Sequence, residues 1–265
     1  MNIDQLFQTI EQSESLDQLT FPQSWAQGRT AFGGLSASLA FVAMRKFVSA
    51  ERLTRSLSVQ FVGPLLADLA FAIDVEVLRE GKSSSMLLAK VIQSGQVCLT
   101  LQACFAKDRD SAIVVTPERE VPFSVVDTEK TAPFIKGVTP DFTQHFSVNV
   151  QVGQLPFTAS EQATLGGWLK FKRAPTAISD AHIIALIDAW PPATLQMTPK
   201  PSPASSMTWN IDFIKPNAEL AATGWLGYLC ETTASSNGYA HTQARVFDQS
   251  GELIATSNQS VTVFA

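Results

Sequence analysis

Apolar and polar residues alternate over much of the last third of the chain, a pattern typical of β-strands. These β-rich runs lie between Ala204 and Ala265, and Pro216, Asn237-Gly238 and Ser250-Gly251 separate them. Turn signals at this spacing predict consecutive antiparallel strands. Just upstream, residues 180–190 are apolar on nearly every side, which predicts a buried helix.

The first half of the chain shows a similar order of elements. Residues 3–12 predict a short helix and residues 21–27 a short strand, and Gly33-Gly34 precede a helix that is apolar most of the way round. Short turn segments then separate β-like runs, which predicts an antiparallel meander. The predicted strands are Thr54–Val62, Leu69–Leu78, Ser84–Gln93 and Val97–Ala106. A buried helix followed by an antiparallel sheet indicates an α+β fold.

Residues 108–140 differ in character from the rest of the chain. They mix charges with prolines and show no sustained periodicity, which predicts a linker that crosses the surface. The domain organisation that follows is an N-terminal unit over residues 1–107, a linker over 108–140 and a C-terminal unit over 141–265. The strand-like stretches 145–153 and 166–173 open the second unit.

An internal repeat relates the two units. LSVQFVGP (57–64) aligns with WNIDFIKP (209–216), and IQSGQVCLT (92–100) aligns with DQSGELIAT (248–256). With these segments in register, the first buried helix falls opposite the second. The repeat predicts two copies of a helix wrapped by an antiparallel sheet, and only the second copy carries Asp188.

Composition narrows the class of protein further. Charged residues make up 16% of the 265 residues and hydrophobic residues 45%, so we expect a second domain or other subunits to cover much of the surface. We also expect self-association, as a homodimer or higher oligomer. The net charge is −5 and the basic residues are scattered, which argues against nucleic-acid binding. No apolar run is long enough to span a membrane and the N-terminus does not resemble a signal peptide, so we expect a cytoplasmic protein.

Three cysteines without metal-ligand spacing predict neither a disulfide framework nor a metal site.

Asp188 is the strongest candidate for chemistry. It lies in the last turn of an apolar helix, just before Pro191-Pro192, where the helix dipole disfavours a negative charge. A carboxylate in such a position is either exposed to solvent without a role or has a raised pKa and a function.

Two further features accompany Asp188. Gln259 lies on the more apolar of the two faces of the last predicted strand, so its amide points toward the core. There it either ties strands together or serves a site. Gly33 and Gly34 stand before a helix whose first N–H groups lack partners; they either bind a ligand closely or simply make a turn.

Several segments stand out by their order and spacing: FGGLSASLA, RSLSVQFVGP, EVLREGKSSSM, LIDAW, SSMTWNIDFIKP and NGYAHTQARVFDQSGELIATSNQ. Together they resemble the double hotdog fold of the acyl-CoA thioesterase II family and its thioesterase-like relatives. The resemblance covers most of the chain outside the linker. It implies a tandem hotdog with two long central helices, each wrapped by an antiparallel β-sheet.

The resemblance also implies site residues. Asp188 matches the family's aspartate that acts on the hydrolytic water, and Gln259 matches its catalytic glutamine. The family's threonine falls at Ser206, which keeps the hydroxyl and loses the methyl group. Strand alternation puts Ser206 on the opposite face from Met207, Trp209, Ile211 and Phe213, which leaves its place in the site open. Thr208, Thr232 and Thr233 are the alternatives if the register differs.

The implied activity is hydrolysis of an acyl-CoA thioester, with no metal or organic cofactor and with acyl-chain length left open. One alternative is hotdog dehydratase or hydratase chemistry, which needs a histidine placed with an acidic residue. His145, His182 and His241 lie in different predicted elements and fit that chemistry poorly. A non-catalytic acyl- or CoA-binding protein is the other alternative, because Ser206 departs from the family's pattern.

Overall fold

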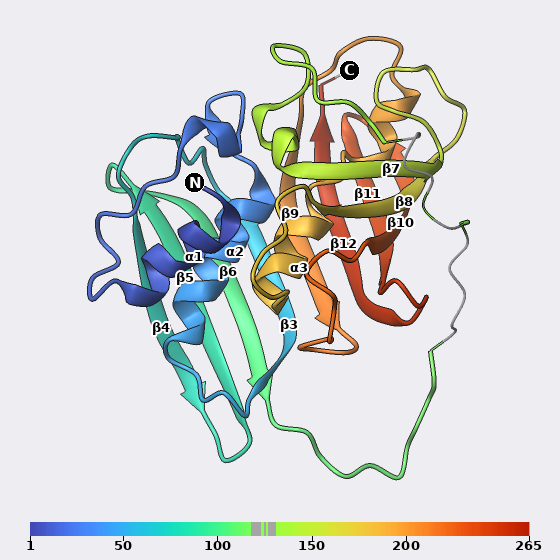
Figure 1. Ribbon diagram of the computed structural model, residues 1–265. Helices are drawn as coiled ribbons and strands as arrows, with labels where there is room; N and C mark the ends of the chain where they lie inside the picture. Colours follow the sequence, from blue (N-terminus) through green and yellow to red (C-terminus); the bar gives the residue numbers. More distant parts are fainter. Residues whose placement is uncertain (118–122, 125, 127–130, 265) are drawn as a thin grey trace.

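The computed structural model describes residues 1–117, 123–124, 126 and 131–264 (Figure 1). Its helices are α1 (Ile3–Gln12), α2 (Gly33–Arg45) and α3 (Asp180–Ile187), with short 3₁₀ helices η1 (Gln23–Trp25), η3 (Asp141–His145) and η4 (Ala193–Met197). The strands are β1 (Ala26–Gln27), β2 (Thr30–Ala31), β3 (Leu53–Phe61), β4 (Ala72–Glu80), β5 (Ser84–Gln93), β6 (Gln96–Ala106), β7 (Phe146–Val152), β8 (Thr164–Phe171), β9 (Ala204–Phe213), β10 (Leu226–Ser236), β11 (Tyr239–Phe247) and β12 (Leu253–Val263).

Ten of the strands form a single antiparallel sheet in the order β4-β5-β6-β3-β9-β12-β11-β10-β8-β7. The expected sheets of the two units are therefore joined edge to edge through β3 and β9. The four strands β3 to β6 and the four strands β9 to β12 have the same order within the sheet, and β7 and β8 extend the second half. The predicted meanders are confirmed for β4-β5-β6 and for β10-β11-β12. They are wrong for β3 and β9, which pair with β6 and β12 and not with the strands that follow them in the chain.

The junction between β3 and β9 lies on the axis that relates the two repeats. Ser58 and Asn210 occupy equivalent positions of the aligned segments, and they pair directly across the junction. Their neighbours exchange, because Leu57 pairs with Ile211 and Val59 pairs with Trp209. This is the pairing expected for two copies related by a pseudo-two-fold axis, as in a symmetric dimer.

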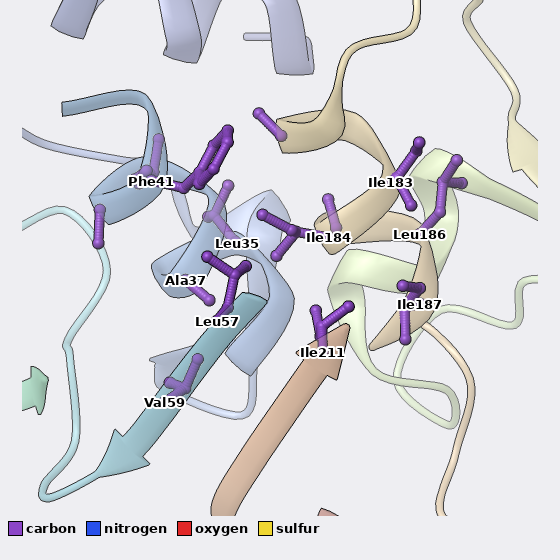
Figure 2. Close-up of a cluster of buried hydrophobic side chains, with 14 of the residues drawn as sticks. Leu35, Ala37, Phe41, Leu57, Val59, Ile183, Ile184, Leu186, Ile187 and Ile211 are labelled. Carbon is purple, nitrogen blue, oxygen red and sulfur yellow. The ribbon is translucent and has the colours of Figure 1, made fainter. Parts of the chain in front are cut away.

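Helices α2 and α3 pack together on one side of the sheet. Every residue of α2 from Gly34 to Met44 is buried, and so is every residue of α3. Figure 2 shows Leu35 of α2, Ile184 of α3 and Leu57 of β3 in one apolar cluster. Both helices are apolar on nearly every side, so they are stable only when the protein buries them on all sides.

Several predicted boundaries need correction. Helix α3 has eight residues and ends at Ile187, so the expected pair of long central helices reduces to α2, with thirteen residues, and a short partner. Pro191-Pro192 did predict an end, but the helix ends earlier, with Asp188 as its C-cap. The strand expected at Leu69–Leu78 begins at Ala72. Of the short strand expected over residues 21–27, only Ala26–Gln27 (β1) is a strand, and the 3₁₀ helix η1 precedes it.

The expected linker, residues 108–140, falls partly outside the described residues. Its described start, residues 108–117, has no helix or strand and runs as an extended loop away from the body of the molecule (Figure 1). Its described end packs back on the fold, where Ala132 donates its N–H to Val148 of β7. Among the helices that the structure describes, none is long and apolar enough to cross a membrane.

Candidate active site

Asp188 joins the end of α3 to the beginning of α2. Its carboxylate Oδ2 accepts the backbone N–H of Gly34 at 2.6 Å. Gly34 is the second residue of α2, where unpaired N–H groups and the helix dipole attract a negative charge. The dipole at the end of α3 opposes the charge of Asp188, but the dipole at the start of α2 stabilises it.

Gln259 and Ser206 extend this contact into a chain of hydrogen bonds. The Nε2 of Gln259, on β12, donates to Asp188 Oδ1 at 2.7 Å. The hydroxyl of Ser206, on β9, donates to Gln259 Oε1 at 3.3 Å. Both oxygens of Asp188 are therefore fixed, and the amide of Gln259 is oriented from both ends. The structure brings together all the site residues expected from the sequence.

A β-bulge explains how Ser206 reaches Gln259 against the expected alternation. Thr208 pairs with Ser260, but the next pairing joins Ser206 to Val261 and leaves Met207 without an opposite residue. One extra residue reverses the alternation of the strand, so Ser206 lies on the same face as Gln259. Thr208 lies on the other face of the strand.

The remaining alternatives for the hydroxyl lie elsewhere. Thr233 is exposed and donates to the carbonyl of His241. The hydroxyl of Thr232 is buried without a hydrogen-bond partner among the described residues. Neither residue is among those that line the cavity described below.

Burial raises the pKa of Asp188 from 3.8 to about 7, although the hydrogen bonds from Gln259 and Gly34 lower it. Removal from water disfavours the charged carboxylate, and no cation among the described residues makes an ion pair with it. Asp188 is half-buried and lines the cavity described below, so a reactant there can reach its carboxylate. A carboxyl group that changes its protonation near neutral pH suits a general base.

A cavity of about 710 Å³ opens beside these residues. Asp188, Gln259, Ser206 and Gly33 line it together with mainly apolar side chains, including Phe61, Phe142, Phe146, Leu99, Leu195 and Trp190. No lysine, arginine or histidine is among the described residues that line it. The cavity has a volume typical of a small-molecule site and would bind an uncharged, apolar group.

The sequence did not identify Phe61, Phe142 and Phe146 as residues that line this cavity. Phe61 is the aromatic residue of the F-x-x-P segment that both repeats contain, so the repeat was the one available signal. Phe142 and Phe146 follow the linker in a stretch without a recognisable motif, and their position depends on how the chain folds back.

The three histidines make their contacts outside this cavity. His182 Nε2 lies 3.0 Å from Asp4 Oδ1, its Nδ1 lies 2.8 Å from the Ser179 hydroxyl, and burial lowers its pKa. This group joins α1 to the start of α3. His145 stacks on Trp25, and His241 contacts Ser260 on the outside of the sheet. Among the described residues, no three His, Cys, Asp or Glu side chains group closely enough to bind a metal ion.

Solved structures similar to the chain define the class of fold. A protein of unknown function with the hot dog fold from Alicyclobacillus acidocaldarius is 23% identical, with 94% of this chain and 92% of that chain covered and a TM-score of 0.77. A putative thioesterase II from Thermobifida fusca is 18% identical over 97% of both chains, with a TM-score of 0.75. The tesB protein of Mycobacterium avium subs paratuberculosis is 16% identical over 99% of both chains, with a TM-score of 0.77. The chain therefore has the hotdog fold.

Family models identify the family. The acyl-CoA thioesterase N-terminal domain matches residues 21–106, and the acyl-CoA thioesterase C-terminal domain matches residues 121–263. The chain belongs to the acyl-CoA thioesterase family, whose members are thioester hydrolases. No curated protein matches it.

Replacement of Gly34 by alanine should displace Asp188. A Cβ at this position would lie 2.6 Å from the Phe32 ring, 2.9 Å from Asp188 Cβ and 3.1 Å from the Ala185 carbonyl oxygen. We expect Gly34→Ala to lower stability by about 1–3 kcal/mol, as overpacking does, and thioesterase turnover at least tenfold. Thermal unfolding and CoA release measure the two effects. Gly81→Ala is the control, because its Cβ would meet no atom closer than 3.6 Å; equal behaviour of the two variants would contradict the contact.

Proposed function

We propose that the protein hydrolyses an acyl-CoA thioester with a water molecule that Asp188 activates. The observation that carries the proposal is a carboxylate whose two oxygens are fixed by Gln259 and Gly34 at the wall of an apolar cavity. A carboxylate at the wall of a cavity, with a pKa raised to near neutral, is typical of a residue that transfers protons.

In the proposed reaction, Asp188 accepts a proton from water while the water oxygen attacks the thioester carbonyl carbon. The carbon–sulfur bond then breaks, the carboxylic acid is released, and the proton on Asp188 passes to the departing sulfur of CoA. Gln259 and Ser206 hold the water and the carboxylate in position. Since the proton balance closes within the site, the reaction needs no metal or organic cofactor.

The N–H of Gly33 is the proposed donor to the carbonyl oxygen. The N–H of Gly34 already donates to Asp188, so it cannot also stabilise negative charge on the substrate. Gly33 lines the cavity, and none of the described residues accepts a hydrogen bond from its N–H. At the first position of α2, this N–H points where the helix dipole favours a developing oxyanion.

The cavity fits the acyl group and not the nucleotide part of CoA. Its described lining residues include no cation, so the phosphates would lie outside, at the surface. The acyl chain would lie against apolar side chains, where burial contributes about 25 cal/mol per Å².

Two alternatives make different demands on the same cavity. Dehydratase or hydratase chemistry would need a histidine in the cavity. The one His–Asp pair among the described ion pairs is His182 with Asp4, and neither residue is among those that line the cavity. A binding protein would keep the pocket and lose turnover. Release of CoA from several acyl-CoAs, measured beside calorimetric binding, separates these functions: binding without CoA release would favour the binding protein.

Turnover should depend on pH through Asp188. Only the carboxylate can accept a proton from water, so kcat/KM should rise with pH and level off above an apparent pKa near 7. The rate of CoA release between pH 5 and 9 measures this profile, with the slow spontaneous hydrolysis subtracted. A profile that is flat from pH 5 to 8 would show that another group limits the rate.

Self-association as a homodimer or higher oligomer, expected from the low charge content, stays a prediction, and so does a cytoplasmic location.

A further inference from the structure

The wall of the cavity that lies beside Asp188 is aromatic. Phe61, Phe142 and Phe146 line the cavity, and Phe32 lies behind Phe142 and Phe146; we call these four residues the aromatic wall. They come from β3, η3, β7 and the residue before α2, so the fold collects them from both halves of the chain.

Three rings of the aromatic wall, those of Phe32, Phe142 and Phe146, hold one another in fixed orientations. Phe142 stacks on Phe32 with ring centroids 4.4 Å apart and planes 13° apart. Phe146 meets Phe32 edge to face at 5.8 Å and meets Phe142 at 6.3 Å and 71°. Phe32 stacks in turn on Trp25. Such pairs restrict ring motion, so the cavity presents faces and edges of rings in a set geometry.

Phe61 brings this aromatic surface to the reacting atoms. A Cβ built on Gly33 would lie 2.8 Å from the tip of the Phe61 ring and 2.7 Å from Asp188 Oδ2. The ring therefore lies against Gly33, within a few ångströms of the carboxylate. A group attached close to the substrate's carbonyl carbon would contact Phe61 first.

On the basis of the proposed thioesterase function, we propose that the preferred substrate carries an aromatic ring within one or two carbons of the thioester carbonyl. A ring that packs against the aromatic wall gains stacked or edge-to-face contacts that a methylene chain cannot make, each worth about two- to tenfold in affinity. A linear chain also loses the rotation of many more bonds when it is ordered in a rigid cavity. Apart from Asp188, the described lining residues carry no charge, which favours a ring without charged substituents.

The test compares phenylacetyl-CoA with octanoyl-CoA, which have the same number of acyl carbons. We expect kcat/KM for the phenylacetyl thioester to be about tenfold higher in the wild-type protein. Phe61→Leu and Phe142→Leu keep an apolar side chain and remove a ring, so each should reduce this ratio at least threefold. Equal or better hydrolysis of octanoyl-CoA by the wild-type protein would overturn the proposal, as would an unchanged ratio in both variants.

Phe71→Leu is the matched control. Phe71 is buried and packs edge to face on Phe21, but it is not among the residues that line the cavity. It should lower stability without changing the ratio of the two substrates. Thermal unfolding of all three variants separates loss of folding from loss of selectivity.

If neither thioester is hydrolysed by the folded protein, the proposed function is wrong, and the aromatic preference is tested by binding alone. Calorimetry with phenylacetate and octanoate then compares the two acyl groups without any reaction. Tighter binding of phenylacetate, weakened by Phe142→Leu, would support the preference on its own. Tighter or equal binding of octanoate would overturn it.

Discussion

Asp188→Asn should reduce the turnover of an acyl-CoA by roughly a hundredfold or more, as expected for the loss of a general base. The substitution preserves the shape of the side chain, and a flip of the Gln259 amide would let the new amide keep its hydrogen bonds to both neighbours. What disappears is the ability to accept a proton from water. Substrate binding should change little, because the apolar lining of the cavity stays intact. The rate of CoA release under single-turnover conditions and the binding affinity of an acyl-CoA measure the two effects separately.

The same variant should affect stability in a way that depends on pH. The pKa of Asp188 is about 7 in the folded protein and near 3.8 in the unfolded chain, so the folded state binds the proton more tightly. The stability that this proton contributes is complete below pH 3.8 and is lost as the pH rises through 7. Asp188→Asn has no such proton, so its stability relative to the wild type should improve between pH 4 and pH 8.

Asp212→Asn is the control for both measurements. Asp212 lies on the exposed face of β9, where it pairs with Thr256 of β12 away from the cavity. It should leave turnover and the pH dependence of stability close to those of the wild type. Near-normal hydrolysis by Asp188→Asn would instead show that Asp188 has a structural role.

Substitution of Gln259 gives a second test of the proposed reaction. Gln259→Ala should reduce turnover by less than Asp188→Asn, because a group that orients the water contributes less than the base. The two losses should be less than additive in the double variant, since in the proposed reaction both groups act on one water molecule.

How much of this site the sequence could predict differs from residue to residue. The inward position of Gln259 followed from strand alternation alone, because period two leaves one face toward the helices. Asp188 was identifiable from the sequence as a carboxylate in an unfavourable position, but its hydrogen bond with Gly34 was not. The contact with Gly34 depends on how α2 and α3 pack end to start, and no local pattern records that arrangement.

Ser206 shows why local rules can mislead near a site. Alternation along β9 placed it away from Trp209 and Ile211, and the bulge at Met207 reverses that result. Bulges are common beside functional sites, where they re-aim a side chain, but they leave no clear mark in a single sequence. The repeat predicted the duplicated architecture, and it could not predict that the two sheets join through β3 and β9.

That junction leads to the largest expected effect on folding: residues 1–107 alone should be insoluble or molten. The isolated segment keeps α1, α2 and β3–β6 but loses the pairing of β3 with β9 and the cover of α2 by α3. It also exposes Phe32, whose ring stacks on Phe142 of the second unit. Each large apolar side chain that becomes exposed costs about 1.5–3 kcal/mol, and a few of them equal the whole stability of a typical domain, about 5–15 kcal/mol.

Near-ultraviolet circular dichroism and thermal unfolding of residues 1–107 test this expectation, with the full chain measured alongside. The segment should show no fixed aromatic signal and no cooperative transition, while the full chain should unfold sharply. Co-expression with residues 108–265 should restore a soluble complex, because the second unit supplies β9, α3 and Phe142. A stable, monomeric segment with sharp thermal unfolding would mean that each repeat folds on its own and that the pairing of Ser58 with Asn210 joins two finished domains.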